Sequence, residues 1–210
     1  MLARIMESAF NEKALRQRVE RLSPQARLAF LLSCGERLAP NYTAFRDRHG
    51  WGDFAPLQQA LDLGWKALAR EPLERSEIEA CHARCEEAIP HPDDFTSDYY
   101  VSGALDAGVV CSLVTQLLLE DDPGKVVEGA AQARDTVDMH VQELEDMNPR
   151  DPDLEGKILR HPVMQRELRR QREDLTRLEG AELSPSLVEA LAREWRHPAM
   201  SNIDRPAAPR

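Results

Sequence analysis

Four polar residues, each followed directly by proline, divide the chain and constrain its fold more than any other feature. They lie at Ser23-Pro24, Asp122-Pro123, His161-Pro162 and Ser184-Pro185. A polar N-cap with proline at the first helical position is a typical helix start, because proline loses no hydrogen bond there. The segments between these pairs repeat apolar residues every three or four positions, and none alternates over the length of a strand. The sequence therefore predicts an all-α protein.

One predicted helix, from about Tyr99 to Glu120, is apolar nearly all round, so we expect it at the centre of the fold. The chain has 210 residues, of which 42% are hydrophobic, and this suits one domain with a real core. We expect a single-domain multi-helix bundle over residues 1–200. Residues 201–210 are predicted to form a loosely held tail, because the end of the chain is rich in proline and poor in apolar residues.

Two predicted helices carry narrow apolar seams, in which the apolar positions alternate in steps of four and three. The first seam lies within residues 126–147 and the second within residues 164–178. Such spacing is typical of closely paired helices. The two seams could pair within one chain or face the same helices of a second copy, and the second arrangement would give a homodimer.

The most specific local signals lie between residues 34 and 53. Pro40 is predicted to end the preceding helix, because its ring cannot continue the backbone hydrogen bonds. Asn41 would then cap the next turn. Gly50 and Gly52 predict a tight turn with positive φ angles.

Polar side chains in the same stretch allow two interpretations. Glu36 and Arg37 are neighbours and cannot face each other on a helix, so each needs a partner elsewhere. They could tie a corner of the bundle to nearby backbone, or they could line a polar pocket roofed by Tyr42 and Trp51. We favour the first interpretation, because corner loops are commonly held in this way. Asp53 is the predicted N-cap of the helix that follows.

Several short strings resemble one known family. The first is Glu36-Arg37-x-x-Pro40-Asn41-Tyr42-x-x-Phe45, followed by Gly50-x-Gly52-Asp53. The later ones are Glu86-Glu87-Ala88-Ile89-Pro90 with Asp93-Asp94-Phe95, then Asp106-Ala107, and finally Ser201-Asn202-Ile203. In these strings and their order, over residues 13–203, the chain resembles the YjaG-like family of bacterial proteins. The resemblance implies an all-α domain of unknown function and supplies no activity.

Asp106 lies inside the most apolar predicted helix, where an ionised carboxylate is costly unless it is paired or hydrogen-bonded. It could be a site carboxylate with a raised pKa, or it could make a structural contact such as an ion pair with Arg37. We favour the structural contact. The candidate binding residues are Glu36, Arg37, Asn41, Tyr42, Asp53 and Asp106.

Two Glu-x-x-His strings, at residues 79–82 and 194–197, allow a ferritin-like di-metal site if two further helices each add an acid. Glu36 and Glu128 are the acids available. The flanking positions of both strings are of solvent type, and His197 precedes a proline at a helix end. We therefore expect no metal and no cofactor.

The net charge and the cysteines limit the kinds of partner and the cellular compartment that we expect for this protein. A net charge of −10 argues against binding to nucleic acid or to an anionic membrane. The arginines within residues 166–177 alternate with acids, which predicts the surface pairs Arg169–Glu173 and Arg170–Asp174. The four cysteines form no CxxC pair and the N-terminus does not resemble an export signal, so we expect a reduced, cytoplasmic protein.

Together these features predict a non-enzymatic cytosolic protein that acts through self-association, as a dimer, or through protein binding. The alternative is a small-ligand-binding protein or an enzyme with a polar pocket near Glu36, Arg37 and Asp106. The ferritin-like metal protein is the third and weakest alternative.

Overall fold

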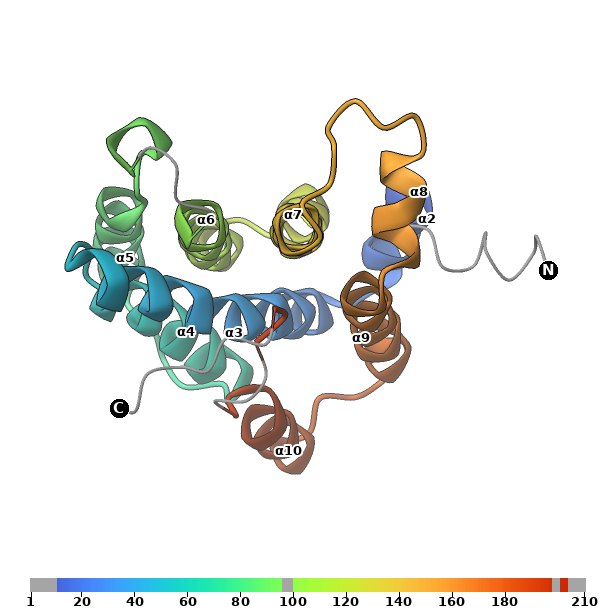
Figure 1. Cartoon of the computed structure of the whole chain (residues 1–210). Coiled ribbons are helices and arrows are strands. Elements are labelled where there is room, and N and C mark those ends of the chain that lie inside the picture. The colour runs from blue at the N-terminus through green and yellow to red at the C-terminus, as the bar shows by residue number, and fades with distance from the viewer. Residues whose placement is uncertain (1–10, 96–99, 198–200, 204–210) are drawn as a thin grey trace.

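The structure is a computed structural model that describes residues 11–95, 100–197 and 201–203. Every regular element in these residues is a helix, so the expected all-α single-domain bundle is confirmed (Figure 1). The elements are α2 (Glu12–Arg21), α3 (Pro24–His49), α4 (Ala55–Leu68), α5 (Arg75–Ala88), the 3-10 helix η1 (Pro92–Phe95), α6 (Tyr100–Leu119), α7 (Pro123–Leu144), α8 (Leu154–Arg160), α9 (Pro162–Leu178) and α10 (Pro185–Trp195).

Helix α6 is the central element, as its apolar composition predicts. It packs against α3, α4, α5 and α7, and it lies between α5 and α7 in Figure 1. Ala107, Val110 and Val114 are fully buried along it. Within the described residues α6 alone has the length and apolar composition of a membrane span, and most of it is buried among the other helices.

The four predicted helix starts are confirmed. The side chain of Ser23 accepts a hydrogen bond from the backbone N–H of Ala26, and Asp122 accepts one from Gly124. Ser184 caps α10 in the same way, and an imidazole nitrogen of His161 accepts the N–H of Val163 at the start of α9. In each helix proline occupies the first turn, where no intrahelical N–H bond is lost.

Pro40 does not end a helix, because α3 continues through it to His49. The predicted helix end at Pro40 and the predicted capping role of Asn41 are therefore wrong. An internal proline costs about 3 kcal/mol. However, α3 is buried throughout residues 28–42, and each large apolar side chain buried there contributes about 1.5–3 kcal/mol. Packing on both sides of Pro40 thus outweighs the lost hydrogen bond.

The turn after α3 has the expected backbone. Gly50 has φ 63° and Gly52 has φ 94°, so the predicted turn with positive φ angles is confirmed. Helix α4 begins at Ala55 with Phe54 as its cap, one residue later than predicted. Asp53 still holds this helix start, because its carboxylate accepts the N–H of Ala55 at 2.9 Å.

The two seams pair within one chain, because α7 packs against α9. Val137 and Val141 of α7 share an apolar cluster with Met164 and Leu168 of α9. Of the two arrangements left open by the sequence, the structure adopts the intramolecular one. Most of both seams is therefore covered, although Leu144 at the end of α7 is 59% exposed, and a dimer needs a surface other than these paired residues.

The last described residues are buried rather than loosely held. Ser201, Asn202 and Ile203 are all almost inaccessible to solvent, and Ile203 belongs to the apolar cluster between α7 and α9. The predicted tail thus begins too early, because apolar and polar contacts retain these three residues. Residues 204–210 of the predicted tail lie outside the described residues.

Candidate functional site

Arg37 is the centre of a buried charged network. It is 1% exposed, and its Nη1 donates to the carboxylate of Asp174 at 2.7 Å. Its Nε lies 3.3 Å from the carboxylate of Glu167. Both acids lie on α9, so the predicted ion pair between Arg37 and Asp106 is wrong. Burial alone would lower the pKa of Arg37, but the carboxylates of Glu167 and Asp174 more than compensate and raise it.

Gln171 extends this network from α9 to α7. Its side-chain N–H group donates to Glu167 at 3.0 Å and to the backbone carbonyl of Ala130 at 3.0 Å. Glu167 is fully buried, so the hydrogen bond from Gln171 and the nearby guanidinium of Arg37 offset part of the cost of removing its charge from water. The network therefore joins α3, α7 and α9.

Asn41 and Asn202 tie the end of the chain to the same region. The Asn41 amide donates to the Asn202 side-chain oxygen at 3.0 Å, and the Asn202 amide donates to the carbonyl of Ala133 at 2.9 Å. The backbone N–H of Asn202 donates to the carbonyl of Arg37 at 3.2 Å. Ser201 donates to the Asn41 side-chain oxygen at 3.3 Å. Asn41 therefore holds the segment 201–203 instead of capping a helix.

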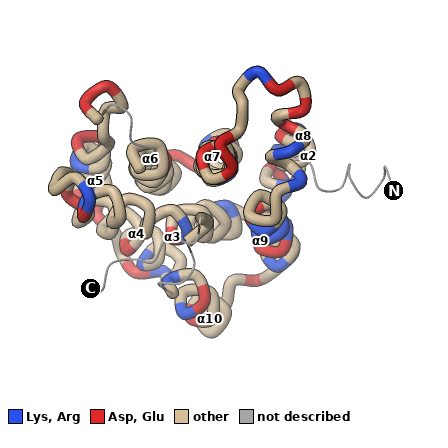
Figure 2. Tube along the Cα trace, viewed as in Figure 1, with Lys and Arg blue, Asp and Glu red and all other residues tan. Residues whose placement is uncertain are grey.

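Two arginines of α9 complete this attachment. Arg166 donates to the carbonyl of Asn202 at 2.9 Å, and Arg170 donates to the carbonyl of Ser201 at 3.3 Å. The blue residues along α9 in Figure 2 are arginines, and part of their charge is thus directed at backbone oxygens. Asp174 is engaged by Arg37, and neither predicted surface pair, Arg169–Glu173 nor Arg170–Asp174, forms in the described part of the chain.

Glu36 faces away from this network, toward α4 and α10. Its carboxylate accepts the indole N–H of Trp65 at 2.8 Å and lies 3.4 Å from the guanidinium of Arg196. Arg196 also donates to Asp62 at 2.5 Å. Glu36 and Arg37 therefore find partners on different sides of α3, as their sequence spacing requires.

Tyr42 anchors α3 to the end of α5. Its hydroxyl donates to the carbonyl of Ala88 at 2.7 Å. Burial, with a smaller effect from the nearby carboxylate of Asp53, raises its pKa to about 12. Trp51 is 37% exposed and packs against Phe45 and not over Glu36 or Arg37. The described residues therefore do not form the predicted pocket roofed by Tyr42 and Trp51.

Asp106 makes the predicted kind of structural contact with an unpredicted partner. The hydroxyl of Thr136 on α7 donates to its carboxylate at 2.6 Å. Burial raises the pKa of Asp106 to about 7, although this hydrogen bond acts in the opposite direction. The neighbouring charge of Asp135 adds a smaller increase. Asp106 is therefore a buried acid without a cationic partner in the described residues.

The six candidate residues do not surround one cavity. Arg37 and Asn41 belong to the same network through Asn202, whereas Glu36 faces α4 and α10. Tyr42 contacts the end of α5, Asp53 holds the start of α4, and Asp106 contacts α7.

The two Glu-x-x-His strings do not converge either. Glu79 pairs with Arg75, and Glu194 pairs with Arg177. His82 contacts hydroxyl groups of α6 through its Nδ1. Across residues 11–95, 100–197 and 201–203, no group of three or more His, Cys, Asp or Glu side chains is placed to hold a metal ion.

Sequence reasoning missed Glu167, Asp174 and Asn202. One signal was present: Glu167 and Asp174 are seven residues apart, so they lie on one face of α9, beside the apolar seam. Acids at this spacing next to a seam indicate a buried cation from another helix. The sequence marks Asn202 only as part of the family string Ser201-Asn202-Ile203, which does not reveal its partners on two distant helices.

The fold described above is shared with a known family of helical proteins. A family described as "Protein of unknown function (DUF416)" matches residues 14–204, so the chain belongs to it. The chain is 29% identical over 187 residues to the uncharacterized protein YjaG of Escherichia coli K12, covering 89% of this chain and 93% of that protein. The crystal structure of a DUF416 family protein from Shewanella baltica OS155 superposes with a TM-score of 0.81 at 26% identity. This match covers 91% of this chain and 97% of the other. The family resemblance found in the sequence is thus confirmed, and the function of this family is unknown.

Proposed function

We propose that this protein is a non-enzymatic helical protein that acts by self-association, as a homodimer. The candidate residues Arg37, Asn41 and Asp106 support a structural role, because each is hydrogen-bonded inside the fold. The four cysteines are free and buried, which supports the expectation of a reduced, cytoplasmic protein.

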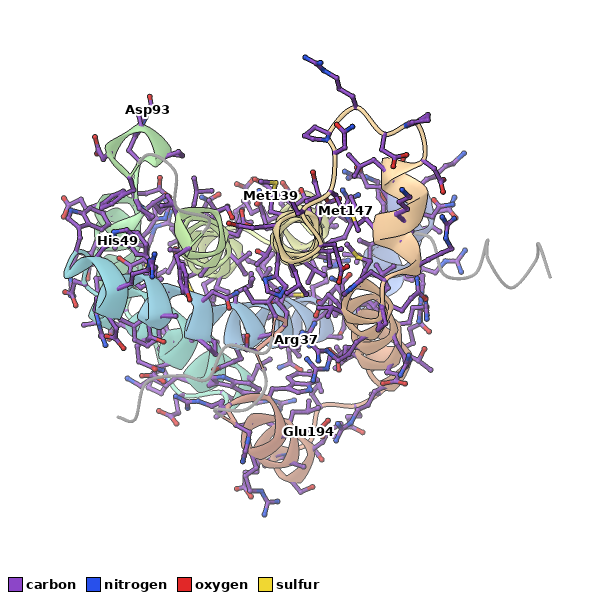
Figure 3. All side chains as sticks on the ribbon, viewed as in Figure 1. Arg37, His49, Asp93, Met139, Met147 and Glu194 are labelled. Carbon is purple, nitrogen blue, oxygen red and sulfur yellow. The ribbon has the colours of Figure 1, made fainter. Side chains whose placement is uncertain are left out.

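The observation that carries this proposal is the half-exposed side chain of Met139. It is 49% exposed on α7, close to α6 (Figure 3). Leu105 and Val109, one turn apart on α6, are also partly exposed. No described helix covers the face where α6 and α7 lie side by side (Figure 1). An exposed apolar side chain on α7, together with partly exposed apolar side chains on the adjoining α6, favours a contact with another protein.

A second copy fits this face because two-fold contacts pair one surface with itself. Met139 of each copy would then be covered by the same apolar group of the other. The seam residues that α7 and α9 already bury against each other, such as Val137 and Met164, take no part in this contact.

The proposal is tested by light scattering after gel filtration over a concentration series. We expect a dimer for the natural chain and at least about tenfold weaker association for Met139→Glu, because a carboxylate would be buried at the contact. Ser186→Glu adds the same charge at an exposed position of α10 and serves as the control. A natural chain that stays monomeric at about 100 μM would contradict the proposal.

A further inference from the structure

A groove of about 580 Å³ lies between α4 and α10, beside the contacts of Glu36. Leu63 and Trp65 of α4 form its floor together with Val188 and Ala192 of α10. The indole of Trp65 is fixed there, because its N–H donates to Glu36. This size and this apolar floor are typical of sites for small molecules.

Carboxylates stand on both sides of the floor. Glu71 and Glu77 line the groove near the connection from α4 to α5, and Glu189 lines it from α10. None of these three has an ion-pair partner in the part of the chain that the structure describes. Their negative charge is therefore available to a cationic ligand.

The cations in the lining oppose such a ligand only weakly. Arg196 lies between Glu36 and Asp62, at 3.4 and 2.5 Å, so its charge is largely neutralised. Lys66 is the other cation of the lining, and its side chain is exposed on α4. The acidic lining residues outnumber the basic ones, which favours a ligand of positive charge.

We propose that this groove binds an aliphatic diamine or polyamine. The methylene chain of such a molecule would cover the apolar floor, where it removes apolar area from water. Its ammonium groups would then reach the acids at the two rims, Glu77 on one side and Glu189 on the other. An anionic ligand would meet unpaired carboxylates at both rims.

Calorimetry with spermidine tests this proposal in physiological salt. We expect saturable binding of one spermidine per chain and clearly weaker binding of hexaamminecobalt(III), which carries the same charge without methylene groups. Equal binding of the two cations would overturn the proposal, because it would reflect only general attraction to a chain with net charge −10.

Two double variants distinguish the effect of the rim carboxylates on binding from the effect of the overall surface charge. Glu77→Gln combined with Glu189→Gln is expected to weaken spermidine binding about tenfold. Glu20→Gln combined with Glu155→Gln makes the same change of charge at exposed positions outside the groove and should leave the affinity unchanged. Equal losses in both double variants would contradict a site in the groove.

A third variant tests the floor without changing any charge. Ala192→Leu would enlarge a side chain that lines the groove, so it should weaken spermidine binding while the melting temperature stays close to that of the natural chain. Unchanged affinity in this variant and in Glu77→Gln with Glu189→Gln would overturn the proposal. A basic amphipathic peptide that binds the groove while spermidine does not would overturn it too.

Discussion

Glu36 and Arg37 are neighbours in the sequence, yet they belong to two unlike regions of the molecule. Arg37 lies in a closed network with Glu167 and Asp174, from which water is almost excluded. Glu36 meets Arg196, whose side chain is 35% exposed and borders an open groove.

The difference teaches where charge stabilises this fold and where it remains available for binding. In the closed region every charged group depends on another buried group, so removing one leaves the others unpaired in a medium of low dielectric. In the open region water can replace a lost partner, so the same chemistry contributes little to stability.

The largest effect is expected for Arg37→Met. This change leaves the carboxylates of Glu167 and Asp174 buried without their cation, so the free energy of unfolding should fall by about 3–5 kcal/mol. Urea unfolding followed by circular dichroism measures it. Arg75→Met, which breaks the exposed pair with Glu79, is the control and should cost less than about 0.5 kcal/mol. Similar losses in the two variants would remove the distinction between the regions.

Asp106 sharpens the comparison, because it is a buried acid with no cation beside it among the described residues. Its pKa is raised to about 7 in the folded chain, from the ordinary aspartate value of 3.8. The folded state therefore holds its proton more tightly, and stability should fall as pH rises from about 4 to 7, by about 2–4 kcal/mol.

Asp106→Asn keeps an acceptor for the hydroxyl of Thr136 and removes the ionisation. Unfolding in urea at several pH values should show that this variant gains stability relative to the natural chain as pH rises through that window. An identical pH dependence in both proteins would show that Asp106 does not cause it.

The smallest effect is expected in the open region, for Arg196→Gln. Because Arg196 is about one-third exposed, the loss of its contacts with Glu36 and Asp62 should lower the free energy of unfolding by only about 0.5–1 kcal/mol. The same urea titration measures it. A loss as large as that of Arg37→Met would mean that the groove side is as closed as the network.

Most of the fold could be predicted from the sequence, because helix starts and apolar spacing are local signals. Ser23 and Ser184 cap the helices that they were predicted to cap, and the apolar helix α6 lies at the centre. The local signal failed at Pro40, where the burial of α3 among five other helices decides the outcome.

The polar contacts were much less predictable. Asp174, one of the two carboxylate partners of Arg37, lies 137 positions away on α9, and no feature near Arg37 distinguishes it from Asp106. Tertiary packing alone selects between them. The groove between α4 and α10 was missed for a similar reason, because its floor and rims are assembled from separate helices.

The burial of residues 201–203 has a consequence for how the protein is made. Asn41 and Asn202 are 161 positions apart, and both contact the core where α3, α7 and α9 meet. A chain emerging from the ribosome therefore cannot close this part of its interior until residues 201–203 have been made. The helices of the first half can form earlier, but the final arrangement depends on contacts between segments that lie far apart in the sequence.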